Sequence, residues 1–79
     1  MLQVYKITIK SSKRIIIAII ECSRVVEWLH ENDIMEATVR KLNRYESTRA
    51  INYLERKAIL RDERAAVEEL KELLQHIKF

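Results

Sequence analysis

The chain contains no glycine and no proline in its 79 residues. Without glycine, a tight turn must use Asn, Asp or Ser, which tolerate a left-handed backbone or cap a helix. The same absence excludes the glycine-rich loops that hold phosphate groups. A chain that lacks both helix breakers is predicted to consist mainly of helices. Because hydrophobic residues make up 48% and charged residues 34%, we expect one folded domain.

The N-terminal half is predicted to contain one strand and two helices. Residues 3–10 alternate between apolar and polar side chains, as a half-buried strand does. Residues 12–31 are expected to form one long helix, because apolar side chains recur at steps of three and four. These side chains are Ile15, Ile19, Cys22, Val26 and Leu29. The β-branched run at 15–20 leaves an alternative open, in which it pairs with the first strand as a hairpin. Residues 35–42 are predicted to form a short helix.

Two further helices are predicted in the C-terminal half, at 46–59 and 63–77. The first has an apolar stripe of Ala50, Ile51, Leu54 and Ala58. The stripe changes phase near 59–62, which indicates a break between two helices. Asp62 is expected to cap the last helix.

Basic residues are concentrated in the middle of the chain. The net charge is +3, with a sequence pI of about 9.2. Residues 37–61 hold seven basic and two acidic side chains, whereas 62–79 hold three basic and five acidic ones. Such a basic segment favours an anionic partner. The alternative is an ordinary solvated helix face.

The segment from Val25 to Leu60 has the pattern helix, short connection, helix, tight turn, helix. Asn43 is predicted to take the left-handed turn position that glycine usually fills, and Tyr45 to fill the apolar gap between the helices. This segment, including STRAINYLERKAI, resembles the winged helix-turn-helix family of transcriptional regulators, of the MarR or PadR kind. It departs from that family at Ala58, where glycine is usual, and in leaving little chain for a wing.

The resemblance implies a mainly α fold with a short N-terminal strand, in which a helix-turn-helix domain with a reduced or absent wing binds duplex DNA. Its recognition helix would be 46–59, with Arg49 approaching guanine and Asn52 adenine. Further contacts to phosphate or sugar would come from Arg40, Lys41, Arg44, Thr48, Tyr53 and Arg56. The function implied is sequence-specific transcriptional regulation.

The last predicted helix carries a wide apolar face. Its members are Val67, Leu70, Leu73, Leu74 and Ile77. We expect this face to form a homodimer, since helix-turn-helix proteins read paired half-sites as symmetric dimers. The alternative is that it packs back on the long first helix.

The sequence offers no arrangement typical of an enzyme. His30 and His76 lie far apart, without a second pair of residues at metal-binding spacing. Cys22 has no neighbouring histidine to activate it, and we expect it to be a small core residue. We therefore predict no catalytic site, no metal, no cofactor and no small-molecule substrate.

A single cysteine and the lack of a long apolar run fit a cytoplasmic protein, of a cell or of an infected host. The abundance of Ile, Glu and Arg is typical of thermophiles.

Two alternative functions remain open at this point. Lys6, Thr8 and Lys10 on one face of the first strand would suit a ribbon-helix-helix dimer, whose paired strands enter the major groove. The chain could instead be a small helical protein-interaction module, such as an adaptor or an antitoxin-like partner, with the basic segment as plain surface.

Overall fold

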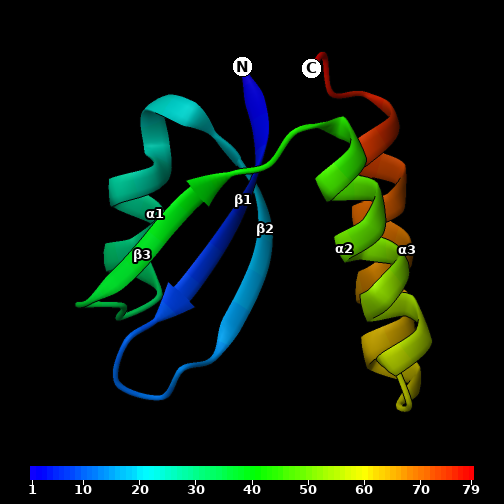
Figure 1. Ribbon diagram of the computed structural model, residues 1–79, viewed down its shortest axis with the longest axis horizontal. Coiled ribbons are helices and arrows are strands. Elements are labelled where there is room, and N and C mark those ends of the chain that lie inside the picture. Colours follow the sequence, from blue (N-terminus) through cyan, green and yellow to red (C-terminus); the bar gives the residue numbers. More distant parts are fainter.

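The computed structural model describes all residues from Met1 to Phe79 and shows a mixed α/β fold (Figure 1). A three-stranded antiparallel sheet and a short helix come first, and a pair of helices follows beside them. The elements in chain order are β1 (Leu2–Ile9), β2 (Ile15–Glu21), the 3₁₀ turn η1 (Cys22–Arg24), α1 (Val25–Glu31), β3 (Ala37–Lys41), α2 (Arg44–Lys57) and α3 (Arg61–Gln75). The strand order is β2-β1-β3, so β1 lies in the centre. No helix is long and apolar enough to cross a membrane.

The predicted long helix at 12–31 is wrong over its first half, and the hairpin alternative is confirmed there. Residues Ile15–Glu21 form β2, which pairs antiparallel with β1. Both faces of this strand meet apolar neighbours, so its sequence is an almost continuous apolar run that also contains a helical spacing by coincidence. The hairpin turns through Lys13 with φ of 56°, and the Ile9 N–H donates to the Arg14 carbonyl at 2.9 Å. A lysine therefore takes the left-handed position, and not the Asn, Asp or Ser that the sequence predicts.

Helical structure begins only after β2. Its main part, α1, ends at Glu31, and Asp33 follows with φ of 56°. The Asp33 and Ile34 N–H groups donate back to the carbonyls of His30 and Leu29, which satisfies the free end of the helix. Cys22 is exposed, contrary to its predicted core position, because the chain leaves the sheet at this residue.

The predicted short helix at 35–42 is also wrong, because Ala37–Lys41 forms strand β3. Val39 lies opposite Ile7 and Ala37 opposite Ile9 on the free side of β1. Ala37 and Val39 alternate with polar residues, and this period of two fits a strand as well as a short helix. The segment becomes a strand because the free side of β1 offers it backbone hydrogen bonds. Only the tertiary structure shows this pairing.

These strands remove the basis for the winged helix-turn-helix arrangement. The segment expected to form the second helix of such a motif forms strand β3 instead. Asn43 is not in a left-handed turn. Its φ is −80°, and it caps α2: its side chain accepts from the Glu46 N–H at 2.8 Å, and the Glu46 carboxylate accepts from the Asn43 N–H at 3.1 Å. Residues 59–66 turn directly into α3 and form no wing. The ribbon arrangement lacks a basis too, since both sides of β1 are paired within the chain.

The last two helices begin and end slightly before their predicted positions. In α2, Ser47 and Ile51 are buried, while Ala50 and Leu54 are half-buried. The start of α3 is held by Glu63, whose carboxylate accepts from the Ile59 and Leu60 N–H groups at 3.1 and 3.2 Å. Asp62 lies in the first turn and is not the cap.

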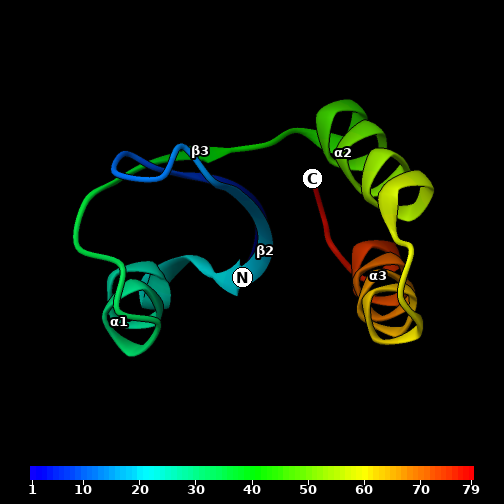
Figure 2. The same cartoon turned by 90° about the horizontal axis from the view of Figure 1, so that it is seen from below.

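Each face of the sheet is covered by different helices (Figure 2). The α1 face carries Tyr5, Ile7, Ala18 and Ile20, packed by Trp28 and Leu29 from α1. The opposite face, which we call the groove face, carries Val4, Lys6, Ile15, Ile17 and Ile19. At one end of this face Val4 packs with Leu42 and Ile77, next to Leu74 of α3. At its other end the groove face is open.

Candidate functional site

The open end of the groove face and the side of α2 enclose a groove of about 570 Å³. Its floor is apolar and consists of Ile15, Ile17 and Leu42. The rim and the wall along α2 add six polar or aromatic side chains and two apolar ones. The polar or aromatic ones are Lys6, Arg40, Tyr45, Glu46, Arg49 and Tyr53, and the apolar ones are Ala50 and Leu54. The volume lies in the range of ligand-binding clefts, and the groove combines an apolar floor with a basic rim.

Aromatic and basic side chains alternate along the α2 wall. Tyr45, Arg49, Tyr53 and Lys57 follow one another at intervals of four residues, and we call this row the α2 ladder. Each step covers about 6 Å along the helix axis, so the four residues form one slanting stripe. The Arg49 guanidinium lies 5.6 Å from the centre of the Tyr45 ring, and the Lys57 ammonium 5.6 Å from that of Tyr53. The two tyrosines are 68% and 58% exposed.

The opposite rim places two cations side by side on neighbouring strands. Lys6 of β1 lies directly opposite Arg40 of β3, and such like-charged cross-strand pairs repel each other. One carboxylate compensates them in part, because Arg40 Nη1 lies 2.6 Å from Glu46 Oε2. Arg40 lowers the pKa of Glu46, and the Asn43 backbone N–H and the charge of Lys6 lower it further. The rim keeps a net positive charge.

Both acidic side chains of the basic segment form ion pairs with basic side chains of the same chain. Glu46 pairs with Arg40, and Glu55 pairs with Lys71 of α3. Glu55 raises the pKa of Lys71 through this hydrogen bond. The other cations of strand β3 and helix α2 form no ion pair: Lys41, Arg44, Arg49, Arg56 and Lys57. Positive charge therefore dominates β3 and α2.

The structure places all eight predicted DNA-binding residues in exposed positions. Arg40 and Lys41 lie on β3, and the other six lie on α2: Arg44, Thr48, Arg49, Asn52, Tyr53 and Arg56. It brings Arg40, Arg49 and Tyr53 together in the groove. Lys41 lies one residue beyond Arg40, so its side chain leaves the opposite face of the sheet. The Thr48 hydroxyl donates to the Arg44 carbonyl at 3.0 Å.

Lys6 and Tyr45 are groove residues to which the helix-turn-helix hypothesis assigns no DNA contact. Lys6 joins the site through the pairing of β1 with β3, which that hypothesis does not include. Tyr45 is exposed and lines the groove, although the sequence predicts that it fills an apolar gap. The four-residue repeat of the α2 ladder is the signal in the sequence that could have identified it.

Four of the five proposed dimer residues lie on α3 and the fifth, Ile77, follows its end. The chain itself uses part of this apolar face. Val67 and Ile77 are buried, and Leu70, Leu73 and Leu74 are half-buried. This face packs against α2 and the sheet of its own chain (Figure 2), because the long first helix does not exist. Dimerisation through the remaining surface stays a prediction.

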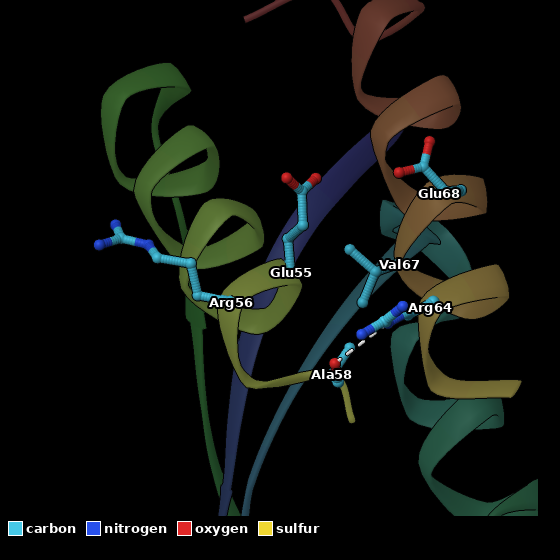
Figure 3. Close-up of a pocket in the computed structure, with 6 residues that line it drawn as sticks. All are labelled: Glu55, Arg56, Ala58, Arg64, Val67 and Glu68. Carbon is cyan, nitrogen blue, oxygen red and sulfur yellow. Dashed lines mark hydrogen bonds between the residues drawn. The ribbon is translucent and has the colours of Figure 1, made fainter. Parts of the chain in front are cut away.

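A second crevice, of about 350 Å³, lies between α2 and α3 (Figure 3). Val67 faces α2 in it, and Arg64 Nε donates to the Ala58 carbonyl at 3.4 Å. Glu55 and Glu68 both pair with Lys71 beside it. Arg56 points away from α3. Of these contacts, the Glu55–Lys71 ion pair and the Arg64–Ala58 hydrogen bond join α3 to α2 and the turn after it. We therefore interpret this crevice as the junction between the two helices.

No group of three or more His, Cys, Asp or Glu side chains lies close enough together to hold a metal ion. Comparisons with protein families, with curated proteins and with solved structures found no match to this chain.

Proposed function

We propose that the protein binds nucleic acid through the exposed side of α2 and the adjoining groove. The observation that carries this proposal is the set of cations on α2 that form no ion pair: Arg44, Arg49, Arg56 and Lys57. Unpaired Lys and Arg side chains clustered along a helix are an electrostatic footprint of phosphate binding.

Duplex DNA is the form that the sequence predicts, and an exposed helix suits a major groove. The 14-residue α2 is about 21 Å long. Arg49, Asn52 and Arg56 are exposed along it. Arginine and asparagine match the hydrogen-bonding edges of guanine and adenine. This proposal no longer depends on a helix-turn-helix.

Fluorescence anisotropy with a labelled random-sequence duplex tests the proposal. Binding should weaken as salt rises, since phosphate contacts release counterions. Arg44→Ala or Arg56→Ala should reduce the salt slope by about one if each contacts a phosphate. Lys10→Ala, which removes an exposed cation outside α2 and the groove, is the matched control and should bind like wild type. Absence of binding at low salt to duplex and single strand alike would contradict the proposal.

A protein-interaction role is the second candidate, and the size of the accessible surface favours it. The chain exposes 6209 Å², whereas a 9.5 kDa monomer is expected to expose about 5,000 Å². The excess is comparable to one side of a standard interface, about 800 Å². Light scattering at rising protein concentration, together with the anisotropy measurement, tests this role: a stable dimer or larger assembly that binds neither duplex nor single strand favours it.

A further inference from the structure

We infer that the groove binds a single, unpaired strand of nucleic acid, so that the protein holds single strands more tightly than duplex. This inference rests on the proposed nucleic-acid binding and specifies the form of the ligand. It depends on the juxtaposition of the α2 ladder, the apolar floor and the Lys6–Arg40 rim.

The two tyrosines provide stacking surfaces that only an unpaired strand can use. Tyr45 and Tyr53 are mostly exposed and line the groove. In a duplex, each base covers the faces of its neighbours and presents only its edges to a protein. An unpaired base can turn its face to an aromatic ring, and single-strand binders combine such rings with a positively charged groove.

The spacing along α2 suits more than one base. Tyr45 and Tyr53 are eight residues apart, which corresponds to about 12 Å along the helix. Successive bases of a stacked strand are about 3.4 Å apart, so the interval spans several nucleotides. Arg49 lies between the two tyrosines on the same ladder, where it can meet the intervening phosphate.

Positive charge on both sides of the groove also favours a nucleic-acid strand. On the opposite rim, Lys6 and Arg40 share a single carboxylate, Glu46. A phosphate group there would relieve the repulsion between the two cations. The backbone of a strand lying along the groove would therefore meet positive charge on both walls, while its bases cover Ile15 and Ile17.

The shape of the site also disfavours duplex in the groove. The groove side of α2 faces the sheet across the groove. A duplex laid against this side of α2 would collide with the sheet. A duplex can reach the outward cations of α2 but cannot place base faces on the tyrosines. The groove therefore adds affinity only for an unpaired strand.

The test measures anisotropy of two labelled probes, an oligothymidine of about 12 nucleotides and a duplex of equal length. Wild type should bind the single strand more tightly than the duplex. Tyr53→Leu should weaken single-strand binding by about 10-fold, because a leucine cannot stack on a base, and should weaken duplex binding less, because a duplex does not present its base faces to the ring. Tyr53→Phe keeps the ring and is the matched control, which should bind like wild type. Tyr45→Leu repeats the test at the other end of the ladder, and circular dichroism checks that each variant is folded.

The outcomes separate this inference from the proposed function. Salt-dependent duplex binding, with Tyr45→Leu and Tyr53→Leu binding the single strand as wild type does, overturns the inference and leaves the proposed function standing. No binding of either probe overturns both. If the tyrosine variants change self-association and not oligothymidine binding, a second copy of the chain occupies the groove, and the inference is overturned.

Discussion

The two faces of the sheet are built from the same three strands but are covered to different extents. On the α1 face, Ile7 has no exposed surface and Tyr5 keeps 8%. On the groove face, Ile15 is 54% exposed. The seven-residue α1 closes one face, whereas α2 and α3 cover the other only at its end near Leu42 and Ile77.

This difference suggests a division between stability and binding. A closed face excludes water from its apolar side chains and supplies the main hydrophobic stabilisation. An open face contributes less stability, but it can carry cations and aromatic rings at the surface. Lys6, Arg40 and Tyr53 all lie at the open face, which agrees with the proposed binding site.

The largest expected effect comes from truncating one isoleucine on each face. Ile7→Ala should lower the free energy of unfolding by about 3 kcal/mol, because it leaves a cavity in a fully buried position. Ile15→Ala removes the same atoms from an exposed position and should change it by at most about 0.5 kcal/mol. Urea unfolding of both variants measures the contrast. Equal losses would show that the groove face is closed in solution.

A smaller effect is expected at the start of α2, where the chain passes from β3 into the wall of the groove. Asn43→Ala removes the side-chain half of the capping box and should cost about 1 kcal/mol, or about 5 °C in Tm for a domain of this size. Thr48→Ala, at an exposed site one turn later, is the control and should be close to neutral. Thermal unfolding followed by circular dichroism gives both values. An unchanged Tm for Asn43→Ala would mean that packing alone fixes this helix end.

The smallest expected effect is a pH dependence at the groove rim. Arg40 and the Asn43 N–H lower the pKa of Glu46 below its ordinary 4.5. A lowered folded-state pKa stabilises the fold above the unfolded value, and this stabilisation is lost as pH falls through the folded value. Stability of wild type should therefore fall in acid below about pH 4.5 more steeply than that of Glu46→Gln. Glu69→Gln, at an exposed position of α3, is the control and should follow wild type. Parallel curves for wild type and Glu46→Gln would contradict the ion pair.

The sequence was informative where local signals act alone. The apolar stripe and phase break in the C-terminal half predict two helices, and α2 and α3 lie within two residues of the predicted ranges. The sequence was misleading where a tertiary contact determines the secondary structure. The apolar run at 15–20 and the ambiguous segment at 37–41 become strands because each pairs with one side of β1. The exposed residues of α2 could be predicted from periodicity, but the Lys6–Arg40 pair could not, since it exists only in the β1–β3 register.

One measurement tests the central claim, that the open face binds nucleic acid and the closed face does not. Two-dimensional ¹H–¹⁵N NMR spectra can follow both faces during addition of oligothymidine. We predict that the amide signals of Lys6, Arg40, Tyr45, Arg49 and Tyr53 shift, while the indole signal of Trp28 on the α1 face stays in place. Shifts concentrated around Trp28 and α1, or no shifts at low salt, would contradict the account.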